Sequence, residues 1–553
     1  MKYCLILFLI LLLFPISILA AQPNNIYGIH LAQPYPDDLK AAANLVNSNG
    51  GDWGYVTLVI QENDRDTAKW QQVFDSLRQL HLIPIIRLAT QAEGQNWRRP
   101  DPSDDDNWIS FLNSLNWVVK NRYVILFNEP NHGSEWGGEV DEKSYAKVAY
   151  DFAKKFKQSN SDYFVMLAGM DASAPSWLPG MEDEQAFLQQ VFEDQPDLIN
   201  YLDGIASHSY PNPGFAGSPY DSGRGSVRTY QWEEGVYKTF GAKKDLPVFI
   251  TETGWGRDKL GEQATASDFQ AAFEDVWSQD KNIWAVTPFV LNYQSEPFLQ
   301  FSWEKPGGSD FYSQYQAVQS IPKIKGDPEQ VQKGSIDFRL PKELVAQSHY
   351  QFVISLKNDG QAIWGKKDDY ELRMTNDELK NTKVIASGLQ DVEPFQQKQV
   401  VIQVDTGEEG DGFGYFVLTK NGFPILKSSK WSFKISPLPS LSFNVSFWPW
   451  GAGEGRDFEI QIFDINEKLV FDRKGVVVKN NQGVIKDIKN IALNEPYRVV
   501  ILKKGYLPRQ TFFIFAEGQN KVEFKSMLPF DINGDGKFDF NDIKALFHKI
   551  LGR

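Results

Sequence analysis

Two stretches decide the fold of the N-terminal half of the chain: YVILFNEP at Tyr123–Pro130 and VFITETGW at Val248–Trp255. Each is an apolar run that ends in a glutamate, as in parallel strands that are buried on both faces. Similar runs alternate with amphipathic stretches from Asn25 to Pro322, which is the pattern of βα units. The strands predicted from these runs are Ile26–Leu31, Tyr55–Ile60, Ile83–Leu88, Tyr123–Asn128, Tyr163–Gly169, Gly204–Ser209, Val248–Thr251 and Ala285–Leu291. Eight such units predict a (β/α)8 TIM barrel over residues 22–325, with helices that include Ala68–Leu80, Trp108–Val119, Glu142–Gln158 and Ala266–Ser278.

The hydrophobic period changes to two after a linker rich in Pro and Gly at Ser320–Gly334. Strands are expected at Gln351–Leu356, Tyr370–Met374, Gln399–Val404, Gly414–Thr419 and Lys430–Ile435, and, after a second linker at Pro437–Pro439, at Asp457–Asp464, Leu469–Asp472, Tyr497–Lys503 and Lys521–Phe524. Two β-sandwiches are therefore predicted, over residues 335–436 and 440–527. The first resembles the Ig-like domain found beside various extracellular enzymes, through Asn358, Gly360, Trp364, Gly414–Tyr415 and Trp431.

Composition limits the classes of partner. The formal net charge is -14 and no basic run offsets it, so a nucleic acid is excluded as an expected partner. Aromatic residues make up 14% of the chain, which fits stacking on sugar rings and also fits aromatic β-sheet cores.

The N-terminal segment, residues 1–21, has the pattern of a secretory signal peptide. Lys2 precedes an apolar run from Leu5 to Ile18, and Ala20 and Ala21 offer small residues for cleavage. An uncleaved N-terminal anchor is the alternative, and both predict an exported protein, secreted or held at the cell surface. The only cysteine is Cys4, which excludes disulfides, cysteine nucleophiles and cysteine zinc sites from the mature chain.

Two carboxylates are expected to face one pocket. Glu129 ends the fourth predicted strand and Glu252 ends the seventh, and the carboxyl ends of barrel strands surround the functional site. Such a pair suits glycoside hydrolysis, in which one carboxyl protonates the leaving oxygen and the other attacks the anomeric carbon or activates water. Asn128, beside Glu129, would bind the 2-hydroxyl of the sugar. Glu135 and Glu139 follow in a Gly-rich loop and are expected to be solvated or to contact substrate.

These motifs resemble the superfamily of retaining (β/α)8 glycoside hydrolases known as clan A, over the whole barrel domain. The resemblance implies that Glu129 is the acid/base and Glu252 the nucleophile. It also implies that Arg87 lowers the pKa of the nucleophile, and that His208 and Tyr210 line the site. His30, at the end of the first strand, is a further candidate, and no cofactor is expected for catalysis. The eighth strand departs from the family, because TPFVLNY (Thr287–Tyr293) lacks the Trp that many members have there.

Several aromatic residues fall in or after loops at strand ends and are predicted to bind sugar: Trp136, Trp255, Tyr293 and Trp303. In the β-domains, Trp448 and Trp450 are the corresponding candidates.

The C-terminal unit, residues 528–553, contains DINGDGKFDFND (Asp531–Asp542), which fits a twelve-position calcium loop. The expected Ca²⁺ ligands are Asp531, Asn533, Asp535, the Lys537 carbonyl, Asp539 and Asp542, and a helix is predicted at Asp542–Leu551. The segment resembles one repeat of a type I dockerin, which implies a cell-surface or scaffold protein as partner. A dockerin normally has two repeats, so this departure puts that partner in doubt. The predicted fold is thus a TIM barrel, two β-sandwiches and a short EF-hand-like tail.

Three functions remain open: an enzyme that hydrolyses a β-linked polysaccharide as a monomer, a non-catalytic carbohydrate-binding surface protein, and a transglycosylase that remodels the cell envelope. The presence of both carboxylates favours an enzyme over a binding protein. No phosphate-binding loop, His-rich metal motif or nucleophile elbow competes with this interpretation.

Overall fold

The computed structural model describes residues 25–242, 245–308, 310–375, 382–386, 388–449 and 451–551. Predictions that concern residues 1–21, Cys4 and Trp450 lie outside this part of the chain. Two compact units are present, Met1–Val331 and Gln332–Arg553. No helix in the described ranges has the length and apolarity needed to cross a lipid bilayer.

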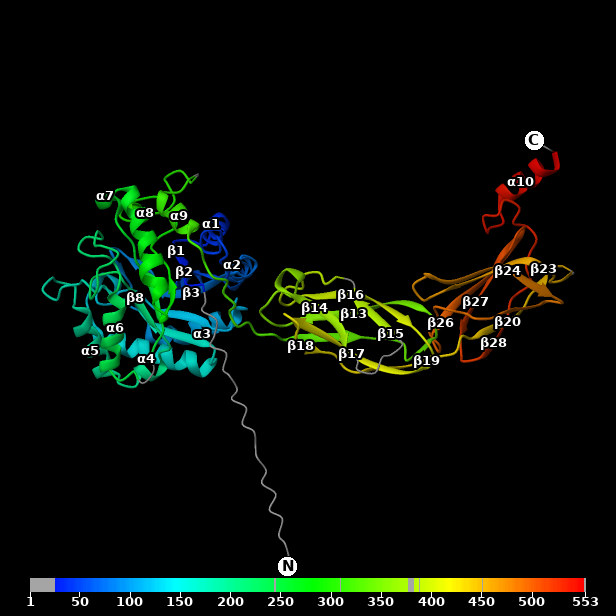
Figure 1. Ribbon diagram of the computed structural model, residues 1–553, viewed down its shortest axis with the longest axis horizontal. Coiled ribbons are helices and arrows are strands. Elements are labelled where there is room, and N and C mark those ends of the chain that lie inside the picture. The colour runs from blue at the N-terminus through cyan, green and yellow to red at the C-terminus, as the bar shows by residue number, and fades with distance from the viewer. Residues whose placement is uncertain are drawn as a thin grey trace, which may run out of the picture. The chain divides into compact units, whose positions relative to one another are not determined.

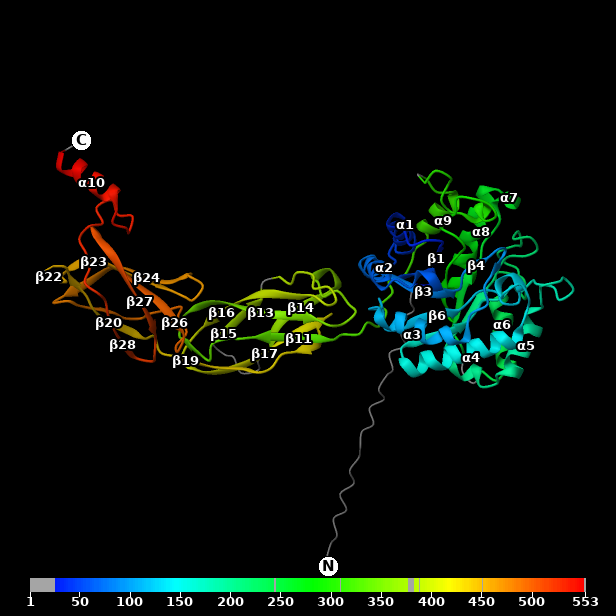
Figure 2. The same ribbon diagram turned by 180° about the vertical axis from the view of Figure 1, so that it is seen from behind.

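The first unit is a barrel of parallel strands surrounded by helices (Figures 1 and 2). Its strands are β1 Gly28–Leu31, β2 Gly54–Gln61, β3 Leu82–Ala89, β6 Arg122–Leu126, β7 Tyr163–Leu167, β8 Ile205–His208, β9 Val248–Glu252 and β10 Ile283–Val286. Hydrogen bonds join them into a sheet of five and a sheet of three. Two parallel bridges, Tyr27 to Val286 and Asp171 to His208, close the ring at both seams. Each of the eight predicted strands is present.

The helices are amphipathic and cover the outside of the barrel. Their bounds are α1 Pro36–Val46, α2 Thr67–Gln79, α3 Asp105–Ser114, α4 Glu142–Ser159, α5 Glu184–Asp194, α6 Thr229–Thr239, α7 Arg257–Leu260, α8 Glu262–Ala271 and α9 Ser313–Ser320. Aspartate caps begin three of them: Asp66, Asp141 and Asp183 accept backbone N–H groups at the first turns of α2, α4 and α5.

In the barrel, three predicted elements differ most from the structure. Helix α3 ends at Ser114 because the next residues turn to bury Trp117 and Val118. Helix α8 ends at Ala271 and continues as a π-helical turn over Ala272–Val276. Strand β10 ends at Val286; Thr287 N still donates to the carbonyl of Ile250 in β9 at 2.8 Å, but by Leu291 the backbone has turned to β1, where Leu291 N donates to the carbonyl of His30 at 2.9 Å.

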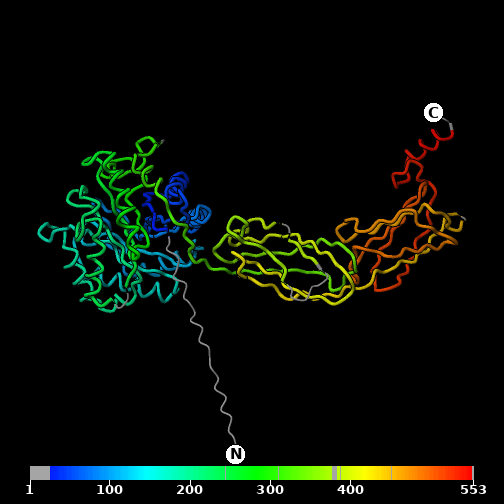
Figure 3. Tube along the Cα trace, viewed as in Figure 1, coloured from blue at the N-terminus to red at the C-terminus, as the bar shows by residue number. Residues whose placement is uncertain are grey.

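The second unit begins with a module of two antiparallel-rich sheets (Figure 3). One sheet contains β11 Gly334–Phe338, β13 His349–Asn358, β16 Gln397–Thr406 and β15 Thr382–Ala386; the other contains β12 Glu343–Val345, β19 Trp431–Ser436, β17 Gly410–Lys420, β14 Tyr370–Thr375 and β18 Phe423–Lys427. Side chains from both sheets, such as Ile354 of β13 and Trp431 of β19, form one buried core, which Trp364 joins from the segment after β13. This module is a β-sandwich.

The next module differs from the prediction, because one sheet of seven strands, beside the short pair β21 Ser446–Phe447 and β22 Gly451–Ala452, replaces the two packed sheets of a sandwich. Its strands, in spatial order, are β27 Tyr506–Ile514, β26 Pro496–Lys503, β23 Gly455–Phe463, β24 Leu469–Lys479, β25 Gln482–Ile485, β20 Ser440–Asn444 and β28 Gln519–Glu523. Register shifts interrupt the pairing of β23 with β24, and such bulges bend and twist strands. Core side chains come from β20, as with Phe443, and from β26, as with Ile501, so the sheet curls around one core.

The two β-modules pack directly against each other. Leu344 and Ala492 form an antiparallel bridge, and the Tyr350 hydroxyl donates to the carbonyl of Ile491 at 2.8 Å. The C-terminal helix α10, Phe540–Leu551, includes the last three residues of the acidic loop Asp531–Asp542 and begins two residues before the predicted start.

Candidate functional site

A cavity of about 390 Å³ lies at the carboxyl ends of the barrel strands. Its walls carry polar groups near the strand ends and an aromatic side formed by loops. The lining side chains include Arg87, Trp97, Arg98, Phe127, Asn128, Glu129, His132, Glu135, Asp171, Tyr210, Phe215, Glu252, Phe289, Phe298 and Phe301. Concave sites with a few convergent polar groups and apolar walls are typical of ligand-binding pockets.

Glu129 stands on a strained turn directly after β6. The backbone of Phe127 has a φ of 73° and that of Glu129 a φ of 30°, both in the left-handed region. Such conformations cost a non-glycine residue about 1–3 kcal/mol and occur mainly at functional sites. The Glu129 N–H donates to the carbonyl of Gly169 at 3.2 Å, which ties the turn to the end of β7.

Glu252, at the end of β9, is buried among hydrogen-bond donors. Arg87 donates to Oε1, and the Tyr210 hydroxyl donates to Oε2 at 3.0 Å. His30 Nε2 lies 3.9 Å from Oε1. Burial by itself would raise the pKa of Glu252, but the cationic His208 and Arg87 outweigh it and lower that pKa to about 2. The carboxylate is therefore held ionised.

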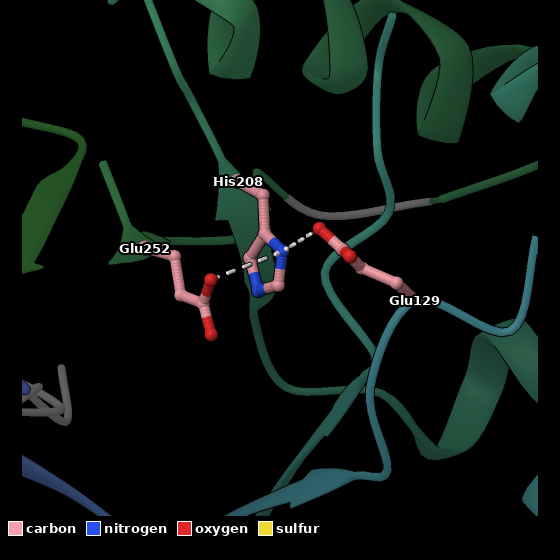
Figure 4. Close-up of side chains that lie close together, drawn as sticks. All are labelled: Glu129, His208 and Glu252. Carbon is pink, nitrogen blue, oxygen red and sulfur yellow. Dashed lines mark hydrogen bonds and ion pairs between the residues drawn. The ribbon is translucent and has the colours of Figure 1, made fainter. Parts of the chain in front are cut away.

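His208 lies between the two glutamates, as Figure 4 shows. Its Nδ1 is 2.7 Å from Oε1 of Glu129 and 4.0 Å from Oε2 of Glu252. Burial lowers the pKa of His208, yet the two carboxylates more than compensate and the net effect is a raised pKa. The ring fits only because residue 169 is glycine, since a Cβ there would lie 2.2 Å from His208 Cδ2.

The glutamates are close enough to act on one bond. Single ligand atoms of Glu129, His208 and Glu252 all lie within 4.8 Å of one another. This trio also has the spacing of a metal site. However, Arg87 is hydrogen-bonded to Glu252, and its fixed positive charge would repel a metal ion. The arrangement suits a reaction in which one carboxyl transfers a proton and the other acts as the nucleophile.

Asn128 joins this network from the other side. Its Oδ1 accepts from Arg87 Nη1 at 2.6 Å, and its Nδ2 donates to Oε2 of Glu135 at 3.2 Å. Arg87 thus connects Asn128 to Glu252. The structure brings together Arg87, Asn128, Glu129, His208, Tyr210 and Glu252, all from strand ends.

His30 is close to Glu252 but does not line the cavity. It packs edge-on against Phe289 with ring centroids 5.2 Å apart, and neither ring nitrogen has a hydrogen-bond partner among the described residues. Burial and the nearby Arg87 lower its pKa to about 3, so the ring is neutral.

Four aromatic residues were predicted to stack on sugar rings, and the structure does not place them to do so. Trp255 and Trp303 are buried away from the cavity and pack against Phe269 with ring centroids 4.8 Å apart in each case. Trp136 is fully buried too and reaches the cavity wall only from behind, packed against Phe127. Tyr293 does not line the cavity and lies behind Phe298 at 5.4 Å. The indole rings of Trp136, Trp255 and Trp303 instead form part of the buried core of the barrel.

The sequence interpretation missed other aromatic side chains that do line the cavity: Trp97, Phe215, Phe289, Phe298 and Phe301. Phe289 follows β10 and belongs to Thr287–Tyr293, the segment that lacks the Trp of many clan A enzymes. Its position directly after a strand was a usable signal, whereas Phe215, Phe298 and Phe301 lie on long loops and gave none.

A polar pair was missed as well. His132 Nε2 is 2.9 Å from Oδ2 of Asp171, and both side chains line the cavity. Asp171 closely follows β7, so the rule that strand ends carry functional groups would have found it. His132 donates its backbone N–H to the carbonyl of Glu129 at 2.8 Å, which places it beside that residue.

The chain matches no protein-family model and no curated protein. Among solved structures it is similar to a family 39 glycoside hydrolase from Bacteroides cellulosilyticus WH2, with a TM-score of 0.40 and 14% identity over 69% of this chain and 81% of that one. A monomeric β-xylosidase from Caulobacter crescentus CB15 has a TM-score of 0.40 and 13% identity over 70% of this chain and 97% of that one. A glucosidase from Croceicoccus marinus has a TM-score of 0.41 and 10% identity over 85% of this chain and 95% of that one. Because these similarities are low, the assignment of function depends on the geometry of the chain's own site.

Proposed function

We propose that this protein is a retaining glycoside hydrolase in which Glu252 is the nucleophile and Glu129 the acid/base. The observation that carries the proposal is the facing pair of carboxyls, whose nearest atoms lie within 4.8 Å. Retaining enzymes place the two groups about 5–5.5 Å apart, and inverting enzymes leave about 6.5–9.5 Å for a water molecule. The spacing supports direct attack by a carboxylate.

The two glutamates have environments that suit different roles. Glu252 is held ionised by Arg87, His208 and Tyr210, as a nucleophile must be. Glu129 is the more exposed of the two, with 21% of its side chain accessible against 10% for Glu252. It shares a hydrogen bond with His208, whose pKa the carboxylates of Glu252 and Glu129 raise against the opposing effect of burial.

In the first step, an oxygen of Glu252 attacks the anomeric carbon and the bond to the leaving oxygen breaks. Glu129 gives its proton to that oxygen, so the products are an alcohol and a glycosyl ester on Glu252. In the second step Glu129 takes a proton from water, whose oxygen attacks the anomeric carbon and displaces Glu252. Asn128 would hold the 2-hydroxyl through both steps, a contact that strengthens in the transition state.

The substrate we propose is a neutral, β-linked glycan. Four carboxyl groups line the cavity, those of Glu129, Glu135, Asp171 and Glu252, and they outnumber the two lining arginines, Arg87 and Arg98, which disfavours an anionic sugar. The phenylalanine wall offers flat apolar faces for the C–H side of a pyranose ring. The enzyme would act as a single copy, because the described site draws all its groups from one barrel.

The proposal is tested by sugar release from β-glucans, xylans, mannans and galactans by the wild type and the Glu252→Ala variant. Release by the wild type alone supports hydrolysis and the role of Glu252. A 2-deoxy-2-fluoro glycoside with a good leaving group should label Glu252, which peptide mass spectrometry would locate. Equal release by both proteins, or a label on another residue, would refute the assignment. No release on any glycan would favour a binding protein, and formation of longer oligosaccharides would favour a transglycosylase.

For the C-terminal loop we propose a Ca²⁺ site and, for the chain, export guided by residues 1–21. Asp531 is 7% exposed, and its Oδ1 is buried with no hydrogen-bond partner among the described residues, as expected of a carboxylate that needs a cation. Asp531, Asn533, Asp535, the Lys537 carbonyl, Asp539 and Asp542 would hold the ion. Since α10 leaves Phe540, Phe547 and Ile550 exposed, a surface or scaffold protein could be bound through this segment.

A further inference from the structure

Glu135 is a third carboxyl in the catalytic cavity. It ends the short 3-10 turn η3, Gly133–Glu135, and lines the cavity beside Asn128. Its Oε2 accepts from Asn128 Nδ2 at 3.2 Å. The reaction proposed above uses only Glu129 and Glu252, so this half-buried acid has no role in it.

The loop around Glu135 is built to hold it over Asn128. Gly133 is pinned at both sides, because its N–H donates to the carbonyl of Gly180 and its own carbonyl accepts from Gly138, at 2.8 and 2.7 Å. A Cβ on Gly133 would lie 2.9 Å from the backbone of Glu139. The next residue after Glu135, Trp136, is fully buried and anchors the turn in the core. This explains why that indole is not available to sugars.

Asn128 is bracketed by opposite charges. Arg87 donates to its Oδ1 at 2.6 Å, and Glu135 accepts from its Nδ2. A donor on one side and an acceptor on the other permit only one orientation of the amide. An amide nitrogen carries two protons, so one remains for a hydroxyl of the bound sugar.

We propose that Glu135 is a positioning residue: its carboxylate fixes the Asn128 amide so that Nδ2 donates to the 2-hydroxyl of the sugar in the transition state. This inference rests on the proposed glycosidase function. Removal of the carboxylate leaves Asn128 held by Arg87 alone, and the amide is then free to turn about its remaining bond. The loss should appear in kcat more than in KM, because the contact to the 2-hydroxyl strengthens as the reaction proceeds.

Burial raises the pKa of Glu135 to about 7, against the opposing effect of the hydrogen bond from Asn128. The experiment is therefore run at pH 8, where the carboxylate is mostly ionised. Glu135→Ala removes the acceptor, and Glu135→Gln keeps a neutral one and the shape of the side chain. Glu139→Gln, on the same loop but 71% exposed and paired with Arg99, is the matched control.

The substrates are the p-nitrophenyl β-glycoside that the wild type hydrolyses fastest and its 2-deoxy analogue. On the parent glycoside, Glu135→Ala should lower kcat about 10-fold, Glu135→Gln should lower it less, and Glu139→Gln should leave it unchanged. On the 2-deoxy analogue all four proteins should have equal kcat, because the hydroxyl that Asn128 would bind is absent. In an Asn128→Ala background, Glu135→Ala should add no further loss.

An equal loss on both substrates, or a full further loss in the Asn128→Ala background, would overturn the inference and leave the glycosidase assignment standing. A wild type with no activity on any glycoside would overturn the proposed function, and this inference with it. A variant that fails to fold would be recognised by its circular dichroism, and Glu135→Gln then decides the outcome by the same comparison.

Discussion

Two buried carboxyls outside the cavity make the stability of the barrel depend on pH. Glu184 on α5 and Glu233 on α6 are each 1% exposed. Burial raises the pKa of Glu233 from 4.5 to about 7, and burial together with the charge of Glu233 raises that of Glu184 as well. Because both pKa values lie above the unfolded value, stability is fully present below about pH 4.5 and decreases as pH rises through about 7.

The size of the effect follows from the shift of Glu233. Moving a pKa from 4.5 to about 7 lowers the free energy of unfolding at alkaline pH by about 3 kcal/mol, at about 1.4 kcal/mol for each pH unit. Glu233→Gln keeps the shape and removes this ionisation. We expect the variant to match the wild type near pH 4.5 and to exceed it by up to about 3 kcal/mol at pH 8.5.

The assay is urea unfolding of the full chain between pH 4.5 and 8.5, followed by tryptophan fluorescence of the barrel. Glu193→Gln, at an exposed position on α5, is the control for a change of net charge. If the free energies of unfolding of Glu233→Gln and the wild type differ by the same amount at every pH in this range, the reasoning is refuted. So would a variant that is less stable than the wild type at pH 8.5.

Three further outcomes are expected. Tyr210→Phe removes a donor to Glu252, and kcat should fall about 10- to 100-fold with little change in circular dichroism, measured on an aryl glycoside. Arg87→Met should raise the pKa of Glu252 from about 2, so the acid limb of the kcat/KM profile should move to higher pH; an unmoved limb would contradict the assigned role. Millimolar Ca²⁺ should raise the melting temperature of the C-terminal transition relative to chelator, and Asp531→Ala should abolish that rise, both measured by scanning calorimetry.

Much of the fold was predictable because its signals are local. Apolar runs of strand length occur where the barrel strands lie, and in a parallel barrel every strand delivers its last residues to the same end. The pairing of Glu129 with Glu252, of Arg87 with Glu252 and of His208 with Glu129 follows from that geometry once the strands are placed. The curled sheet of the second β-module was not predictable, since bulges in β23 and β24 depend on partners far apart in the chain.

The sequence by itself determined which residues end the barrel strands, and hence that two carboxyls, an arginine, a histidine and a tyrosine meet in one place. Only the tertiary structure decided what the loops do, because a loop's path depends on long-range contacts and packing. Because of those contacts, Trp255 and Trp303 lie in the core, Phe298 and Phe301 line the cavity, and Glu135 accepts a hydrogen bond from Asn128. The residues at the strand ends therefore supply the reactive groups of the site, and the loop residues decide the shape of the cavity around them.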